Sequence, residues 1–317
     1  MAELKKISSS PHVRHEDSTA SIMLDVIIAL LPATIMGIYN FGVSAFLLIL
    51  ICIASCLGSE WAFQYFTKRK VSIGDFSAVV TGLLLALNLP PSLPWWMAVL
   101  GSIFAIIIVK QLFGGIGQNF MNPALAARCF LLLSFAKPMT NFTYDAVTTA
   151  TPLALLKAGE QVDVFRMFMG STAGTIGETS TAALLLGGAY LLFKRVIDVR
   201  IPVSYIGTFT ICMVIYAFAS GRGLDWTFVA AHLCGGGLML GAIFMATDYV
   251  TSPITAKGRW IYGVILGILT FVLRSPWNPQ TAAEGVSYSI LCGNLLVPII
   301  ERITVPRAFG KGAVKHE

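Results

Sequence analysis

The sequence predicts an all-α integral membrane protein with about ten transmembrane helices. Hydrophobic residues make up 56% of the 317 residues, charged residues make up only 12%, and the mean hydropathy is +0.77. In soluble globular domains roughly a quarter of the residues are charged. Apolar runs also recur at the length, roughly 17–25 residues, that a helix needs to cross the hydrocarbon of a bilayer. We therefore expect membrane lipid, and no nucleic acid, around this protein.

The expected helices follow a polar N-terminal segment, residues 1–20. That segment has no apolar core, so it is not a cleavable signal peptide, and the first helix serves as the insertion signal. In chain order the expected helices cover residues 22–40, 42–60, 76–91, 94–112, 122–137, 180–194, 201–220, 227–247, 259–275 and 285–303. The third and the sixth are short for a membrane crossing.

The basic residues predict the orientation, because Lys and Arg gather in cytoplasmic loops. With the N-terminus and the tail 304–317 inside, about three quarters of the 22 Lys and Arg residues are cytoplasmic. Beyond the first twenty residues these are Lys68, Arg69, Lys70, Lys110, Lys194, Arg195, Arg200, Lys257, Arg259, Arg302, Arg307, Lys311 and Lys315. Outside fall Lys137, Lys157, Arg166, Arg222 and Arg274. We therefore expect a multi-pass protein of the inner (cytoplasmic) membrane in which the connection 137–179 is extracytoplasmic.

An internal repeat divides the chain into two halves of five helices, residues 21–136 and 180–303. Gly82 and Gly101 of the first half match Gly241 and Gly263 of the second, with a polar break between the helices in each case. An odd number of helices per half turns the second copy upside down, which is the inverted-repeat plan of many transporters. An ion or solute transporter without a redox cofactor is therefore one functional hypothesis.

Three glycines and two asparagines precede the fifth expected helix, in the stretch "GGIGQNFMNPALAARCF". Asn122 is a good helix cap because proline follows it. The amide of Asn119 could bind the polar edge of a heterocycle, and Gly114, Gly115 and Gly117 would let a ring approach the backbone closely. The alternative is that Asn122 is only a cap and Asn119 an exposed loop residue.

Arg128 lies about one and a half turns into the fifth expected helix, where a charge needs a partner. A structural ion pair is the simplest interpretation. The carboxylates near helix ends that could supply the partner are Asp25, Asp75, Asp248 and Glu301. Asp25, Asp248 and Glu301 could equally line a cation path or be ordinary helix-end charges.

The cysteines lack the close spacing of a metal site. All six lie inside expected helices, and the closest pair, Cys52 and Cys56, is four residues apart. We interpret them as small packing residues and expect no metal centre. The chain also lacks the glycine patterns of NAD and ATP sites, and no catalytic residue stands out.

A threonine-rich patch, "DAVTTATPL", interrupts the apolar sequence in the connection 137–179. It resembles the flavinylation motif of two related membrane proteins, the D subunit of Rnf complexes and the B subunit of the sodium-translocating NADH:quinone reductase. Asp145, Thr148, Ala150 and Thr151 occupy the motif positions, and Thr149 stands where glycine is more usual. The stretches "SPHVRH", "GGIGQNFMNPALAAR" and "GAIFMATDYVTSPITAKGR" resemble the same family, so the similarity covers nearly the whole chain.

This resemblance implies a flavin-carrying subunit. Thr151 would be esterified to the phosphate of FMN by a separate flavin transferase, and a non-covalent riboflavin would lie near Asn119 and Asn122. The length of the chain is similar to that of the Rnf protein. Such a complex passes electrons between reduced ferredoxin and NAD⁺ and couples this to Na⁺ or H⁺ transport. The implied partners are the other Rnf subunits, including a second flavinylated subunit and iron–sulfur subunits, which hold the nicotinamide and ferredoxin sites.

Overall fold

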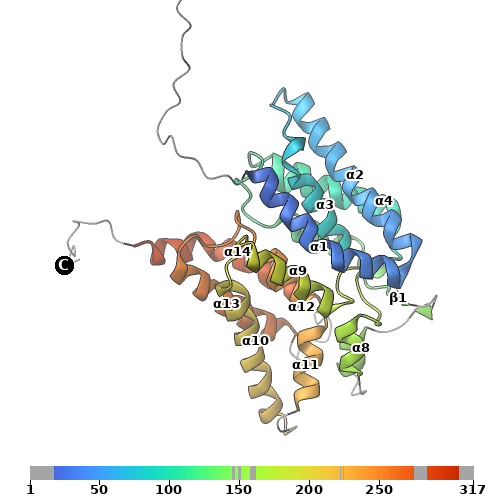
Figure 1. Cartoon of the computed structure of the whole chain (residues 1–317), viewed down its shortest axis with the longest axis vertical. Coiled ribbons are helices and arrows are strands. Elements are labelled where there is room, and N and C mark those ends of the chain that lie inside the picture. The colour runs from blue at the N-terminus through green and yellow to red at the C-terminus, as the bar shows by residue number, and fades with distance from the viewer. Residues whose placement is uncertain are drawn as a thin grey trace, which may run out of the picture.

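The computed structural model describes residues 18–144, 147–148, 151–157, 162–221, 223, 225–274 and 284–306. Helices dominate this part of the chain, so the predicted all-α class is confirmed (Figure 1). Its strands are two residues long each, β1 (Thr143–Tyr144) and β2 (Val147–Thr148), and pair antiparallel.

Most of the helices lie, in chain order, before or after the connection 137–179. The first half contains α1 (Thr19–Phe41), α2 (Val43–Phe66), η1 (Ile73–Asp75), α3 (Ser77–Leu87), α4 (Trp95–Ile103), the π-helix η2 (Phe104–Gln111) and α5 (Pro123–Ser134). The second half contains α9 (Thr181–Phe193), α10 (Arg200–Ala219), α11 (Trp226–Cys234), α12 (Leu238–Leu240), the π-helix η3 (Gly241–Met245), α13 (Ala256–Arg274) and α14 (Gly285–Thr304). Between them lie α6 (Ala136–Met139), the two strands, α7 (Pro152–Lys157) and α8 (Val164–Met169).

Each of the ten expected segments is helical, but their lengths differ. Among the described residues, α1, α2, α10, α13 and α14 are long and apolar enough to cross a membrane. The pair α11 and α12–η3 would make a sixth crossing, bent by 59° at its break. The remaining four segments are apolar helices of 10–17 residues. Ten complete crossings therefore stay a prediction.

Proline and glycine explain two of the interruptions. After α3 the chain is non-helical until α4, because Pro90, Pro91 and Pro94 lack the N–H that a helix needs. Between α11 and α12, Gly236 and Gly237 have φ angles of +67° and +66°, a left-handed conformation that favours glycine. At both interruptions, backbone carbonyl groups accept hydrogen bonds from other segments of the chain.

The packing of the two halves follows a common pattern. In the first half α2 packs on α3 and α4, and in the second half α10 packs on α11 and α13. Likewise α5 packs on α4, and α14 packs on α13. Helices α1 and α9 pack against each other where the halves meet. This agrees with a repeat, while its inverted orientation stays a prediction.

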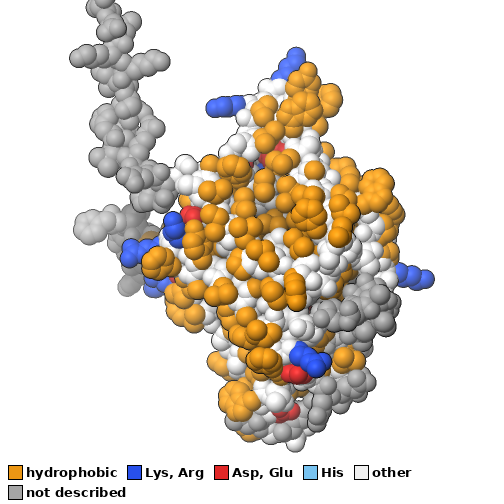
Figure 2. Space-filling view, turned by 45° about the vertical axis from the view of Figure 1, so that its right-hand side comes forward, with side chains coloured by type: hydrophobic (Ala, Val, Ile, Leu, Met, Phe, Trp, Pro, Cys, Tyr) orange, Lys and Arg blue, Asp and Glu red, His pale blue; other side chains and the backbone are white. Residues whose placement is uncertain are grey.

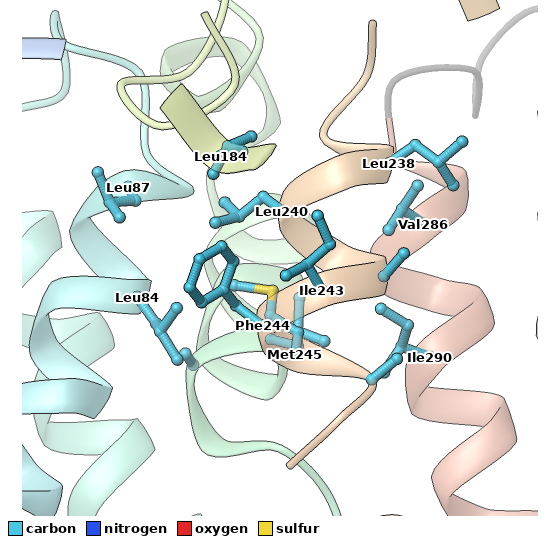
Figure 3. Close-up of a cluster of buried hydrophobic side chains, with 14 of the residues drawn as sticks. Leu84, Leu87, Leu184, Leu238, Leu240, Ile243, Phe244, Met245, Val286 and Ile290 are labelled. Carbon is cyan, nitrogen blue, oxygen red and sulfur yellow. The ribbon is translucent and has the colours of Figure 1, made fainter. Parts of the chain in front are cut away.

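The buried core lies where the halves join. Figure 3 shows Leu84 and Leu87 of α3 on one side of α12–η3 and Val286 and Ile290 of α14 on the other, with Phe244 between. The interrupted helix α12–η3 therefore fills the centre of the molecule.

The surface is apolar over a broad area. Figure 2 shows hydrophobic side chains across most of one face and few charges over its middle. Long helices contribute many of them, including Ile35 of α1, Ile211 of α10 and Ile299 of α14, which are 62%, 61% and 57% exposed. Such a surface fits the hydrocarbon of a bilayer better than water.

The connection between the halves is fastened to the helix ends. The backbone N–H groups of Ile176 and Gly177 donate to the carbonyl oxygens of Leu89 and Leu87, at 3.1 and 2.8 Å. Asn40 at the end of α1 donates to the carbonyl oxygen of Gly170, at 2.7 Å. The start of α1 and the end of α14 lie on one side of the molecule, and β1 lies on the opposite side (Figure 1). This arrangement is compatible with the predicted topology.

A carboxylate ties the loop before α10 to α13. Asp198 Oδ2 lies 3.3 Å from Arg200 Nη1 and 2.5 Å from Arg259 Nη1. Burial acts to raise the pKa of Asp198, but hydrogen bonds from Arg200 and Arg259 and their charges outweigh it and hold the pKa below its ordinary value. The ionised form is therefore favoured in the folded protein.

We expect Asp198→Asn to lower the melting temperature in detergent by a few degrees at pH 7. Because the folded-state pKa is depressed, the stabilisation exists above the ordinary pKa of about 4 and is lost as pH falls through the folded-state value. Melting curves of both proteins at several pH values would test this. A difference that persisted unchanged below about pH 3 would contradict it.

Candidate functional site

A cavity lies between the two halves at the start of α5. Its walls come from α3 and the segment 116–124 of the first half, and from α9 and the segment 244–250 of the second. Asn119, Asn122 and Gly117 line it together with Asp248, and its volume is about 90 Å³. Three of the five residues predicted around a heterocycle therefore meet at one cavity.

Asn119 has an unsatisfied polar atom. Its Oδ1 is buried and accepts no hydrogen bond in the described part of the chain. Leaving a buried acceptor unpaired costs about 1–3 kcal/mol. A ligand that donates an N–H or O–H group into the cavity would remove this cost.

Asn122 has a structural role. Its Oδ1 accepts hydrogen bonds from the backbone N–H groups of Ala124 and Leu125, at 3.1 and 3.3 Å, and so caps α5. The residue is also buried in the cavity wall. The cap accounts for its side-chain oxygen without any ligand.

The glycines shape the loop before α5. Gly114, Gly115 and Gly117 have φ angles of +123°, +97° and +86°, which non-glycine residues rarely adopt. Gly117 lines the cavity, whereas Gly114 and Gly115 lie outside its wall. The positive φ angles are thus sufficient to explain why all three positions are glycine, without a ligand.

A buried ion pair adjoins the cavity. Lys110 Nζ lies 2.8 Å from Glu60 Oε1 and donates to Ser77 Oγ at 2.6 Å, and Gln111 Nε2 donates to the same carboxylate at 2.6 Å. Lys110, expected on the cytoplasmic side within the segment 94–112, has a side chain that is only 2% exposed, so its charge lies inside the protein. Hydropathy gave no signal for the pair, since single charges inside apolar helices barely change a window average.

Arg128 forms a second buried ion pair, with a different partner from those expected. Its Nη2 lies 3.1 Å from Glu284 Oε2, and its Nη1 donates to Asn88 Oδ1 at 2.9 Å. A structural pair is confirmed, but all four proposed partners are wrong. Glu284 directly precedes α14, which packs on α5, so only the tertiary fold brings the two together.

The four rejected carboxylates have other contacts. Asp25 accepts from Tyr190 Oη at 2.7 Å, and Asp75 accepts from Ser77 Oγ at 2.7 Å. Asp248 accepts from the backbone of Val250 at 3.3 Å, and Glu301 accepts from the backbone of Ile254 at 3.0 Å. Asp248 also faces the cavity.

Thr151 lies directly before α7. Its carbonyl oxygen accepts from the N–H groups of Ala154 and Leu155, at 2.8 and 3.0 Å, and its Oγ1 lies 3.4 Å from the nitrogen of Ala154. The residue is half-buried. Thr148 belongs to β2, and Asp145, Thr149 and Ala150 lie outside the described residues. Thr151 therefore lies between strand β2 and helix α7.

Helix α7 rests on the break between α11 and α12. Leu153 is 2% exposed, and the space that a side chain at Gly235 would need is occupied in part by Leu153. Arg274 at the end of α13 donates to the carbonyl oxygens of His232, at 2.9 Å, and Gly236. Arg274, expected on the outer side at the end of the segment 259–275, is buried. It satisfies carbonyl groups that the end of α11 leaves free.

All six cysteines are free thiols. Within the described ranges no three His, Cys, Asp or Glu side chains come together as a possible metal site. Cys52, Cys56 and Cys129 are buried among helices, as packing residues are.

Known proteins resemble this chain over nearly its full length. The D subunit of the Na⁺-translocating ferredoxin:NAD⁺ oxidoreductase complex from Acetobacterium woodii is 50% identical over 321 residues, covering 98% of this chain and 97% of that protein. The D subunit of the proton-translocating complex from Clostridium ljungdahlii is 42% identical, covering 98% of both chains. The D subunit of the ion-translocating oxidoreductase complex from Citrobacter koseri is 35% identical, covering 96% of this chain and 99% of that protein. The sequence pattern of the NQR2, RnfD, RnfE family matches residues 6–310, and the chain therefore belongs to this family.

Proposed function

We propose that this chain is the flavin-carrying membrane subunit of an Rnf-type complex, which transfers electrons between reduced ferredoxin and NAD⁺ and transports an ion. The full-length similarity to the D subunits of such complexes supports membership in the complex. The observation that carries the flavin is the motif ending at Thr151, in a connection opposite the start of α1 and the end of α14. The nicotinamide and ferredoxin sites belong to other subunits.

Thr151 would hold FMN through a phosphoester bond. A threonine hydroxyl is a poor nucleophile unless a base or metal activates it. Attachment therefore calls for a separate flavin transferase. Pro152 limits the backbone of Thr151 to extended conformations, which present the hydroxyl to such an enzyme.

The cavity at Asn119 would hold a second, non-covalent flavin, riboflavin. The buried, unpaired Oδ1 of Asn119 could accept from an N–H or O–H group of that molecule. The free volume of about 90 Å³ is below the roughly 300 Å³ of ordinary ligand sites, so part of the exposed loop 112–121 must move aside. Gly117 and Asn119 belong to that loop.

Two flavins in one chain would serve a transmembrane path. In the predicted topology, Thr151 and the cavity lie on opposite sides of the membrane, separated by about 30 Å of hydrocarbon. Electron transfer across that distance needs intermediate redox cofactors. Thr151 and the cavity at Asn119 would each hold one of these cofactors. The relatives from A. woodii and C. ljungdahlii name different ions, Na⁺ and H⁺, so the coupled ion differs among similar subunits.

The experiment that tests the function is purification of the protein from cells that also make the transferase. We expect a fluorescent flavin band in a denaturing gel, and copurified iron–sulfur and flavinylated subunits. A flavin-free protein that purifies alone would instead favour the inverted-repeat transporter.

We expect Asn119→Leu to reduce riboflavin released by acid extraction about tenfold, because the substitution removes the acceptor from the cavity. Covalent flavin should remain unchanged, which shows that the protein is folded. Asn141→Leu, at an exposed asparagine of the outer connection, is the matched control. Unchanged riboflavin in the folded Asn119 variant would place that site elsewhere.

A further inference from the structure

An apolar groove runs between α9 and α10 on the outer surface of the second half. Leu185 and Leu192 line it from α9, and Val203, Ile206 and Gly207 line it from α10. The groove has a volume of about 470 Å³, and its walls are almost entirely hydrocarbon. Leu185 and Val203 are 41% and 51% exposed, so the groove is open to the surroundings.

A polar groove of about 500 Å³ continues the apolar one. The two share Leu192, Ile197 and Val199, so they form one continuous surface. Arg195, Arg259 and Asp198 line the polar part. Lys194 follows α9 and Arg200 begins α10, so the groups around this end carry a positive excess.

Among the cations that line the polar groove, Arg195 is the one available to bind an anion. Its side chain is exposed, and it forms no ion pair within the described ranges, whereas Arg259 is bound to Asp198. Arg195 also has a φ angle of +57°, where glycine would be less strained. Glycine would relieve the backbone strain at this position, but it would remove the positive charge from the groove.

The combined groove has the polarity of a phospholipid. An apolar channel along two membrane helices matches an acyl chain, and arginines at its end match a phosphate. In the predicted topology that end lies at the cytoplasmic surface, where anionic lipids are enriched. A helix of another protein would fill the apolar part but leave Arg195 without an anion.

We propose that the groove between α9 and α10 binds one anionic phospholipid, its acyl chain against Val203 and Ile206 and its phosphate at Arg195 and Arg259. Lipid binding at this groove does not require either flavin. Such a lipid would brace the loop between α9 and α10, which also supplies part of the wall of the flavin cavity through Val196 and Ile197.

Native mass spectrometry of the full chain in detergent tests the proposal, with dioleoylphosphatidylglycerol and dioleoylphosphatidylcholine titrated separately. We expect one phosphatidylglycerol to bind about tenfold more tightly than phosphatidylcholine, since each basic residue contributes about 1 kcal/mol. Arg195→Gln should weaken phosphatidylglycerol about fivefold. Lys68→Gln is the matched control, an exposed cation with positive φ at the end of α2.

Gly207→Leu tests the apolar part. A Cβ at Gly207 would meet nothing within 4 Å, and Gly207 lines the groove, so a leucine at this position would extend into it. We expect it to weaken both lipids, while Gly58→Leu, at an equally open glycine of α2, leaves them unchanged. Equal binding of the two lipids, or unchanged binding in Arg195→Gln, would overturn the proposal. Loss of a copurifying protein in Gly207→Leu with unchanged lipid binding would identify the groove as an interface within the complex and also overturn it.

Discussion

We expect Thr151→Ala to remove the covalent flavin band from a denaturing gel of the purified protein, because the alanine lacks the hydroxyl that would form the phosphoester. The loss should be complete, since the motif assigns the phosphoester to Thr151 and not to the hydroxyls of Thr148 or Thr149. Thr151→Ser should retain fluorescence, because it keeps the nucleophilic group. The measurement is in-gel fluorescence normalised to protein, with the flavin transferase present.

The variant should remain folded. Thr151 contributes no more than a helix cap for the short α7, about 1 kcal/mol. Acid-released riboflavin should therefore be unchanged in Thr151→Ala. Thr140→Ala, in the same connection but outside the motif, is the matched control and should keep the band. Fluorescence that survives in Thr151→Ala would place the covalent flavin on a different residue.

Glu284→Ala should be the most destabilising of the substitutions considered. Arg128 is 4% exposed, and without Glu284 its charge would stay buried with only Asn88 as a described partner. Breaking a buried ion pair from one side costs roughly 3–5 kcal/mol. In a chain of 317 residues that lowers the melting temperature by about 5–8 °C.

A double-mutant cycle measures the interaction energy between Arg128 and Glu284 apart from the contacts that each makes with other residues. Arg128→Met combined with Glu284→Leu should cost less than the sum of the single variants, because no unpaired charge remains. The exposed pair Arg166 and Asp163, whose side chains are 72% and 56% exposed, provides the control. Arg166→Ala should change the melting temperature little. Additive effects in the buried pair would show that Glu284 does not compensate Arg128.

The helices were predictable because their signals are local. Apolar runs, the Asn122–Pro123 start of α5 and the prolines after Leu87 each act on neighbouring residues, so the sequence located all ten helical segments. Their lengths were less predictable. Hydropathy averages could not distinguish the 11-residue α3 followed by a non-helical segment from one continuous crossing, because both are equally apolar.

The candidate site was predictable in part. The motif at Thr151 and the cluster before α5 are contiguous in sequence, so residue types alone singled them out. That Asn119, Asn122 and Gly117 share a cavity with Asp248, about half the chain away, required the packing of one half on the other. The structure also assigned the oxygen of Asn122 to the helix backbone and left that of Asn119 unpaired.

By itself the sequence determined the membrane class, the positions of the helices and the family, and it predicts that Thr151 carries a flavin. Only the tertiary structure decided the partners of the buried charges, Glu60 with Lys110 and Glu284 with Arg128, and the groove between α9 and α10. The physical reason is the range of each effect. Transfer to lipid and helix capping depend on a residue and its neighbours, whereas an ion pair or a cavity depends on which helix faces meet, and residues 128 and 284 meet only after both halves have packed.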